Sequence, residues 1–402
     1  MLRSLFSGIS GLRVHQTMMD VTGNNIANVN TAGYKSSQSV FEDTLSQMLK
    51  AAGAPQNGAG GTNPAQVGLG VRLAGINTNF TQGGTQTTGR STDLMINGDG
   101  FFVVKSGAEN MYTRSGAFNF DTNGVLTGPG GAVVQGWMAT NGVINTNGAT
   151  TDVKLPMGTL LQPTITTKAA VSGNLPADDL SAGTTPVLTS MTTYDAQGNE
   201  VTLSVSLTRN SANSWDVTIS DGVNPPSTST LTFTNGGTPT FVADATTPTA
   251  TTKLYNGITV DFAGMSSYAG RSTVSSRSLD GSAMGSLQSF TISPDGTLVG
   301  VFSNGLKQPL AQIAMATFNN PNGLEKAGGS MYRTTVNSGV AQLGTAGSGG
   351  RGDLQNNSLE MSNVDLAQEF TNLIIAQRGF QANSKVISTS DELLNDLVNL
   401  KR

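Results

Sequence analysis

The sequence predicts an α+β protein that is mainly β. We expect the N- and C-terminal helices to pair as a coiled-coil-like domain, with discontinuous all-β domains of sandwich or barrel type nested between them. Heptad patterns at the two chain ends and hairpin turn signals between them support this prediction. At 402 residues the chain exceeds one typical domain and suggests two or three.

The N-terminal helix is predicted by apolar residues that recur in the alternating three- and four-residue steps of a heptad. This position holds Leu2, Leu5, Ile9, Leu12, Gln16, Met19, Gly23 and Ile26. Glycines at positions 8, 11 and 23 weaken the helix, each by up to ~1 kcal/mol relative to alanine. We therefore expect this helix to be marginally stable by itself.

The C-terminal helix has the stronger pattern. Ser362 with Asp365 predicts a capping box at its start, with Asn363 as an alternative cap. One heptad position is apolar throughout, at Leu366, Leu373, Phe380, Ile387 and Leu394. The position expected to partner it holds Phe370, Gln377, Ser384, Asp391 and Val398, and is polar in the middle. A helix over 363–400 would be roughly 57 Å long at 1.5 Å per residue.

Between the helices the sequence has the signals of antiparallel strands. Asn123-Gly124 and Asp295-Gly296 each lie between apolar runs, and such pairs supply the positive φ that tight hairpin turns require. Apolar residues alternate with Thr and Ser from Val201 to Leu207 and again from Trp215 to Ile219. This alternation predicts half-buried strands.

Shifts in composition predict a nested chain in which each domain except the central one is built from two segments. A Gly-, Ala-, Asn- and Pro-rich stretch indicates one link, a Gly-rich stretch before the last helix indicates another, and the middle is rich in Thr and Ser. The expected parts are a terminal helical assembly domain (1–30 and 363–402), a connecting region (31–70 and 345–362), an inner β domain (71–138 and 284–344) and an outer β domain (139–283).

Composition excludes several classes of function. Charged residues make up only 12% of the chain and the net charge is −4, which argues against a nucleic-acid-binding protein. There is no cysteine and one histidine, His15, so we expect no catalytic residues, no cofactor and no metal. No apolar stretch is long enough for membrane insertion, and the N-terminus lacks the apolar core of a secretory signal.

The heptads fit two arrangements. The helices could pack within one globular domain, as an antiparallel hairpin of a monomer. Alternatively, an apolar stripe left exposed at the chain ends is an association surface, and a head-to-tail interface that does not close generates a helical filament.

Through the segments 24–35, 362–366 and 376–385, the sequence also resembles a known family, the flagellar rod, hook and hook-associated axial proteins. The segment 24–35 is similar to the N-terminal signature of that family, and the segments 362–366 and 376–385 are similar to its C-terminal signature. Phe380 stands where tyrosine is commoner and Ser384 where alanine is usual. The matching N-terminal residues are Asn24, Asn25, Ala27, Asn28, Thr31, Gly33, Tyr34 and Lys35.

The resemblance implies a structural protein that is not an enzyme. By it we expect subunits that are exported unfolded by the flagellar type III export apparatus, without a cleaved signal peptide, and that polymerise outside the cell as a helical tube. The insert 139–283 favours the hook branch, because distal rod proteins of the family are shorter. Implied partners are the distal rod protein, a hook cap and hook–filament junction proteins. The alternatives are a rod or hook-associated protein and, more remotely, a secreted β-rich adhesin.

Overall fold

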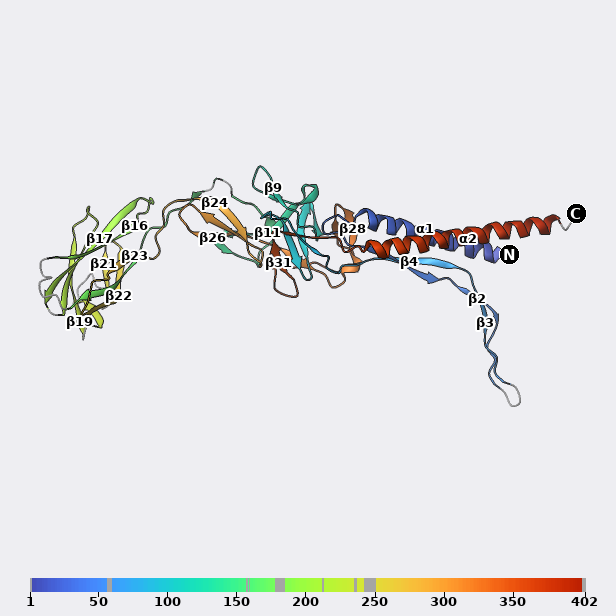
Figure 1. The fold of residues 1–402 in the computed structure, drawn as a ribbon, viewed down its shortest axis with the longest axis horizontal. Coiled ribbons are helices and arrows are strands. Elements are labelled where there is room, and N and C mark those ends of the chain that lie inside the picture. Colours follow the sequence, from blue (N-terminus) through green and yellow to red (C-terminus); the bar gives the residue numbers. More distant parts are fainter. Residues whose placement is uncertain are drawn as a thin grey trace. The chain divides into compact units, whose positions relative to one another are not determined.

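The structure is a computed structural model, and it describes residues 2–55, 60–156, 158, 160–177, 185–211, 213–234, 237–241 and 251–399. Strands are the commonest regular element, and a long helix lies near each chain end (Figure 1). The chain divides into two compact units. The first comprises Met1–Pro156, Thr291–Val299 and Gln308–Arg402, and the second comprises Met157–Phe290 and Gly300–Lys307. The predicted fold class, mainly β with paired terminal helices, is confirmed.

Two helices of the first unit lie side by side, α1 (Leu2–Ala27) and α2 (Leu366–Asn399) (Figure 1). The carboxylate of Asp365 caps α2, because one of its oxygens accepts the backbone N–H of Ala367 at 2.9 Å and of Gln368 at 3.3 Å. The prediction of Ser362 or Asn363 as the cap is therefore wrong. An acidic cap near a helix N-terminus also interacts favourably with the helix dipole.

Four antiparallel strand pairs lie close to the helices in the sequence. They are β1 (Ser37–Asp43) with β4 (Val71–Thr78), β2 (Ser46–Lys50) with β3 (Ala65–Gly68), β6 (Leu94–Asn97) with β31 (Asp353–Asn356), and β5 (Thr85–Thr87) with β32 (Ser358–Glu360). The expected connecting regions 31–70 and 345–362 thus contain paired strands. The Gly- and Pro-rich composition that suggested a link belongs to the segment between β2 and β3.

The main sheet of the first unit has the strand order β26-β11-β7-β8-β29-β28. Its strands are β7 (Phe101–Ser106), β8 (Glu109–Thr113), β11 (Val133–Thr140), β26 (Lys307–Ile313), β28 (Glu325–Gly328) and β29 (Met331–Arg333). Short elements beside it are β9 (Asn119–Phe120), β10 (Leu126–Thr127), β12 (Val143–Ile144), β13 (Thr151–Asp152), β27 (Met315–Thr317), β30 (Gln342–Gly344), and the 3-10 turns η1 (Pro129–Gly131) and η3 (Pro321–Gly323). Edge-to-face ring contacts of Phe101 with Phe318 and Tyr332 lie at the centre of its core.

The predicted hairpin turns are present. Asn123-Gly124 connects β9 to β10, which pair antiparallel, and Gly124 has a φ of 75°. Asp295-Gly296 connects the neighbouring strands β24 (Gly285–Ile292) and β25 (Thr297–Phe302), and Gly296 has a φ of 82°. Both glycines have the left-handed conformation that a Cβ would strain.

The second unit consists of two sheets around one core. The antiparallel sheet contains β16 (Val187–Tyr194), β17 (Glu200–Ser211), β18 (Ser214–Ser220), β19 (Ser227–Thr234) and β20 (Thr238–Phe241). The other contains β21 (Thr252–Tyr255), β22 (Ile258–Tyr268), β15 (Lys168–Pro176) and β23 (Ser275–Ser278), and the short β14 (Leu160–Leu161) pairs with β24. Residues of both sheets form the core, including Leu203, Trp215 and Phe262.

The alternating residues that predicted strands in the middle of the chain are buried as expected, at Leu203, Val205 and Leu207 on β17. The structure places the start of the second unit after Pro156, whereas composition placed the outer domain from 139. The difference arises because β12 and β13 pair with β11 of the first unit. Their Thr- and Asn-rich composition resembles that of the insert.

Leu231→Ala should lower the free energy of unfolding of the second unit by about 2–5 kcal/mol, because it leaves a cavity at a fully buried position. The chain has two tryptophans, Trp137 in the first unit and Trp215 in the second. Urea unfolding followed by fluorescence in a Trp137→Phe background reports the second unit, and a Trp215→Phe background reports the first. An equal shift of both transitions would show that the units do not unfold separately.

Candidate assembly interface at the terminal helices

Small residues make the closest contacts between α1 and α2. A Cβ added at three of the glycines would lie within 3.3 Å of the facing helix, so the absence of a side chain permits the close approach. The facing pairs are Gly8 with Ile387, Gly11 with Asn383 and Gly379 with His15. Because the partner numbers fall as the α1 numbers rise, the helices are antiparallel.

One of the two predicted heptad positions of α2 faces α1. Leu373, Phe380, Ile387 and Leu394 are half-buried, whereas Leu366, at the start of the helix, is exposed. The predicted partnering position is exposed at Phe370, Gln377, Ser384 and Asp391, so its placement in the helix contact is wrong. The covered positions lie one residue earlier, at Glu369, Ala376, Asn383 and Ser390. Residues that lie three and four positions after a given residue share a helix face with it. The apolar pattern alone therefore did not show whether the position of Glu369 or that of Phe370 faces α1.

The predicted apolar residues of α1 are covered only in part. Leu5, Ile9, Leu12, Met19 and Ile26 are all half-buried. The side chains of Leu2 and Val398 lie outside the described part of the chain. The most deeply buried side chains of α1 are Val14, Thr22 and Asn25. Thr22 and Asn25 are polar, so a search for apolar periodicity did not detect them.

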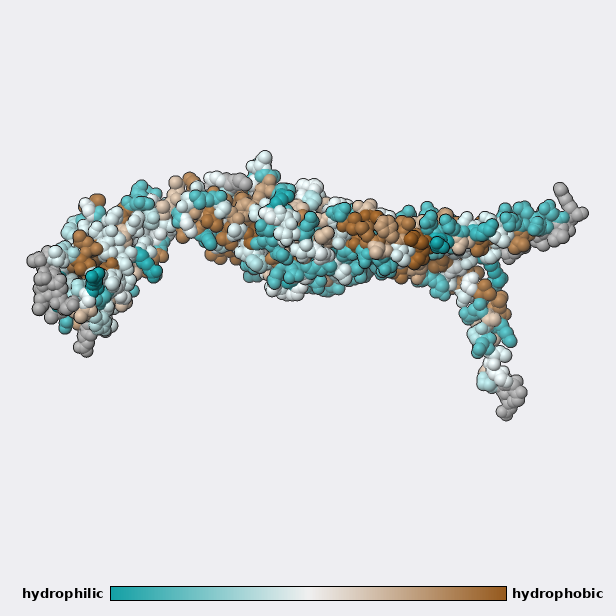
Figure 2. Space-filling model, in the orientation of Figure 1, coloured by the Kyte–Doolittle hydropathy of each residue, from teal (hydrophilic) through white to brown (hydrophobic). Residues whose placement is uncertain are grey.

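Much apolar surface of the helix pair stays exposed. Phe6 is 64% exposed and Phe370 is 52% exposed, and further exposed residues are Ile374, Ile375, Val386 and Leu393. Figure 2 shows apolar surface gathered over the helical part of the first unit. A contiguous apolar surface of this kind marks an interaction site.

The side chain of Asn25, near the end of α1, binds both the turn that follows α1 and the facing helix α2. Its amide donates to the carbonyl of Ser37 at 2.7 Å and to the carboxylate of Glu369 at 2.9 Å. Its carbonyl accepts the Tyr34 hydroxyl at 3.1 Å and the backbone N–H of Ser37 at 3.0 Å. Three of these hydrogen bonds fix the turn that follows α1, and the fourth connects it to α2, so this buried amide group is fully paired.

The remaining signature residues shape the same turn. The Asn28 amide donates to the carbonyl of Asn24 at 2.9 Å, and the Thr31 hydroxyl donates to Asn28 at 3.1 Å. Asn24 also donates to the Tyr34 hydroxyl at 3.1 Å, while Ala27 ends α1 at an exposed position. These local bonds explain why the asparagines recur at this helix end.

Gly33 allows the chain to reach the inner β strands. Its φ is 68°, and a Cβ there would lie 2.5 Å from the backbone nitrogen of Ser115. Its N–H donates to the carbonyl of Glu360 at 2.8 Å. Only glycine fits a left-handed position with a backbone so close.

Lys35, Glu360 and Arg114 form a buried ionic group that we name the ion clasp. The Lys35 ammonium lies 2.5 Å from the carboxylate of Glu360, and both side chains are fully buried. The Arg114 guanidinium, 2% exposed, lies 3.6 Å from the other carboxylate oxygen. Burial lowers the pKa of Lys35, and attraction by Glu360 acts in the opposite direction.

The ion clasp was not predicted as a unit. Lys35 was singled out only by the family signature, and no pattern singled out Glu360. Asn363 adds a neighbouring connection, because its carbonyl accepts the N–H of Ser36 at 2.8 Å and its amide donates to the carbonyl of Asn79 at 2.8 Å. The only available signal was the rarity of charge in this chain.

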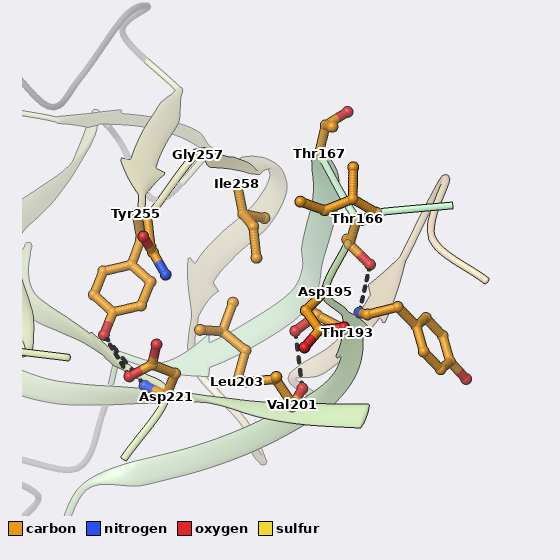
Figure 3. Close-up of a pocket in the computed structure, with 13 residues that line it drawn as sticks. Thr166, Thr167, Thr193, Asp195, Val201, Leu203, Asp221, Tyr255, Gly257 and Ile258 are labelled. Carbon is orange, nitrogen blue, oxygen red and sulfur yellow. Dashed lines mark hydrogen bonds between the residues drawn. The ribbon is translucent and has the colours of Figure 1, made fainter. Parts of the chain in front are cut away.

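A cavity of about 130 Å³ opens in the second unit and contains two carboxylates, Asp195 and Asp221 (Figure 3). Asp221 accepts the N–H of Asn224 at 2.7 Å and the Tyr255 hydroxyl at 3.0 Å. Asp195 accepts the N–H of Asn199 at 2.8 Å. Both carboxylates are thus engaged by their own turns and are poorly placed as a general acid and base.

The described residues offer little other catalytic chemistry. They contain no group of three acidic or histidine side chains that could hold a metal ion. His15 packs against Gly379, and its Nδ1 has no hydrogen-bond partner, so it lacks the orienting acid of a catalytic triad.

Comparisons with known proteins cover both chain ends and the β domains. The model "Flagella basal body rod protein" matches residues 5–35, and "Flagellar basal body rod FlgEFG protein C-terminal" matches 355–400. "Flagellar hook protein FlgE/F/G D1 domain" matches 95–173, and "Flagellar basal body protein FlaE D2 domain" matches 161–282.

Flagellar hook protein FlgE of Treponema pallidum (strain Nichols) is 39% identical over 465 residues, and the match covers 100% of both chains. The chain belongs to the flagellar hook protein family. The family resemblance predicted from the motifs is thereby confirmed, and flagellar hook proteins are structural proteins rather than enzymes. The hook protein FlgE of Escherichia coli (strain K12) is 37% identical, with 98% of each chain covered.

Two further matches bear on fold and on the choice between family branches. The hook protein FlgE2 of Helicobacter pylori has a crystal structure that matches with a TM-score of 0.52 at 15% identity, covering 69% of this chain and 100% of that chain, which supports the fold of this hook family member. Flagellar basal-body rod protein FlgG of Bacillus subtilis (strain 168) is 34% identical over 404 residues, with 100% of both chains covered. The family therefore contains relatives named as hook proteins and a relative named as a rod protein that match over the full chain.

Neither described helix is long and apolar enough to span a membrane.

Gly379→Ala should weaken the helix pair, because the new methyl group would lie 2.5 Å from the His15 ring. We expect the helical circular dichroism signal to melt at a lower temperature, and His15→Ala in the same chain to restore it. Gly23→Ala is the matched control, since no atom lies within 4 Å of its added Cβ and it should stabilise α1 by up to about 1 kcal/mol. Equal shifts in the two glycine variants would contradict the close contact.

Acid should remove a stabilising contribution of Asp221 to the second unit. Burial opposes ionisation, but hydrogen bonds from Asn224, Val223 and Tyr255 outweigh it and lower the pKa of Asp221 from 3.8 to about 2. Because the folded-state pKa is the lower one, the ionised carboxylate stabilises the unit above pH 4, and this is lost as pH falls toward 2. Asp221→Asn should therefore lower the melting temperature at neutral pH but not near pH 2. A constant difference across this range would contradict the assignment.

Proposed function

We propose that this chain is the structural subunit of a bacterial flagellar hook. The subunits polymerise through the terminal helices into a curved, flexible tube, a universal joint that transmits motor torque to the filament and conducts exported subunits. The observation that carries the proposal is whole-length similarity to named hook proteins, at up to 39% identity, in a chain whose paired ends expose an apolar stripe.

The proposed division of labour follows the parts of the chain. The ends, 1–30 and 363–402, form the assembly domain, and 31–70 with 345–362 connect it to the inner β domain of 71–138 and 284–344. The second unit, Met157–Phe290 with Gly300–Lys307, corresponds to the outer β domain and makes weak, sliding contacts between subunits. The Thr- and Ser-rich composition of this part of the chain supports this last point, since hydroxyl groups are uncharged and form no ion pairs that would fix neighbouring subunits in one position.

Assembly proceeds outside the cell, at the distal end of the growing structure. The chain is exported by the flagellar type III apparatus without a cleaved signal peptide, and it meets the distal rod protein, the hook cap and the hook–filament junction proteins. Absence of cysteine and a marginal N-terminal helix suit a chain that is threaded unfolded and folds on arrival.

A distal rod protein is the second candidate, and the full-length match to a protein named as a rod protein favours it. Labelling of intact flagella with an antibody against the second unit distinguishes the two. Label on the curved segment outside the cell envelope supports the hook, and label confined to the rod supports the alternative.

Electron microscopy of the purified chain under salting-out conditions tests polymerisation, and we expect tubes. Phe370→Asp should abolish the tubes while leaving the β units folded, because Phe370 is 52% exposed in the single chain and a charge there would be buried in the contact. Val336→Asp, at a fully exposed apolar position outside both helices, is the matched control and should still form tubes. Persistent monomers of the unmodified chain, or normal tubes from Phe370→Asp, would contradict the proposal.

A further inference from the structure

The ion clasp is assembled from three separate parts of the chain. Lys35 follows α1 in the N-terminal signature, Glu360 ends β32 just before α2, and Arg114 follows β8 of the main sheet. Glu360 is the common partner. Its carboxylate also accepts the N–H of Gly83 at 3.0 Å, and its backbone carbonyl accepts the N–H of Gly33 at 2.8 Å.

Neither Lys35 nor Glu360 can be buried favourably without the other, whereas Arg114 also has a hydrogen bond to the Gly98 carbonyl at 2.8 Å and the attraction of Asp99. Lys35 and Glu360 are fully buried and Arg114 is 2% exposed, so water cannot replace a missing partner in the folded arrangement. A buried charge whose partner has been removed is strongly destabilising, whereas replacement of the whole pair by uncharged groups is often tolerated. The surface pair of Arg72 with Glu42, 68% and 44% exposed, has no such requirement.

The clasp is also continuous with the helix pair. The turn that delivers Lys35 contains Tyr34, whose hydroxyl binds Asn25, and Asn25 in turn binds Glu369 on α2. The segment that delivers Glu360 continues through Asn363, which accepts the N–H of Ser36. Both helices are therefore linked to the same buried charges, in addition to direct contacts of α1 with β1 and β4 such as the hydrogen bond from the Val71 N–H to the Ser10 hydroxyl at 3.2 Å.

We propose that the ion clasp is a conformational device that makes docking of the helix pair conditional on both chain ends being in place. With Glu360 absent, Lys35 stays buried next to the positive charge of Arg114 and without the carboxylate it is paired with, and the N-terminal turn stays undocked. With Lys35 absent, Glu360 retains only the more distant Arg114. A subunit therefore presents its assembly surface only after its first and last segments have both folded onto the main sheet.

Hydrogen exchange on the full-length chain tests the clasp, with peptides that contain Gly33, Ser36 and Gly83 as its reporters and peptides of β7 as a reference for the main sheet. Glu360→Gln should accelerate exchange at the reporters by at least about tenfold and leave β7 unchanged. Lys35→Met combined with Glu360→Gln should restore protection to within about threefold of the unmodified chain. In the double variant, the amide oxygen introduced at position 360 can still accept the N–H of Gly83. The Thr81 carbonyl loses its hydrogen bond from Lys35 but still accepts one from the Asn363 amide.

Glu42→Gln is the matched control, since it removes one member of an exposed ion pair in the same unit and should change no reporter. Three outcomes overturn the proposal: unchanged reporters in Glu360→Gln, loss of protection in β7 as well, or a double variant as unprotected as the single one. The proposal rests on the proposed function only for the role of the docked helices. Exchange is measured on unassembled chains, so a failure of the unmodified chain to form tubes contradicts the proposed function and not the clasp.

Discussion

The antiparallel meeting of the first and last helices is the constraint on which the rest of the first unit depends. It requires the two ends of a 402-residue chain to lie side by side, so each intervening domain has to leave and return at neighbouring points. The pairs β31 with β6 and β32 with β5 meet this requirement, because they join segments more than 200 residues apart. Contacts of such sequence separation form late and carry a large loop-closure entropy, which suits a fold completed only when the whole chain is present.

The way in which the helices meet leaves surface for other contacts. Glycine and small polar residues bring the backbones together, and the larger apolar residues are displaced to the flanks, where Leu373 and Phe380 are only half-covered. A helix with several glycines is also weakened by about 1 kcal/mol for each. Helices of this kind gain most of their stability from packing, and more packing than one chain supplies is available only from other chains.

The sequence predicted the fold class, both helices, the hairpin turns and the alternation on β17, because each depends on local chemistry. It identified one heptad position of α2 but misplaced its partner by one residue, since Ala376, Asn383 and Ser390 carry no apolar signal. The strands within 31–70 were missed because their side chains are largely exposed, so they lack the apolar alternation of a half-buried strand. The family signature pointed to Asn25 and Lys35, but the partners Glu369 and Glu360 follow only from the tertiary structure.

The placement of charge completes this picture. A chain with only 12% charged residues can form few ion pairs, and the pairs on its surface contribute little to its stability. Burying Lys35, Glu360 and Arg114 together costs desolvation free energy, and apolar residues could connect the same segments with a smaller cost. The ionic arrangement adds a requirement that its partners are all present at the same time. An apolar contact weakens gradually when one member is missing, whereas a buried charge that loses its partner is strongly destabilising. Its location, where the two signatures meet the main sheet, is where such an all-or-none requirement would control whether the helices dock.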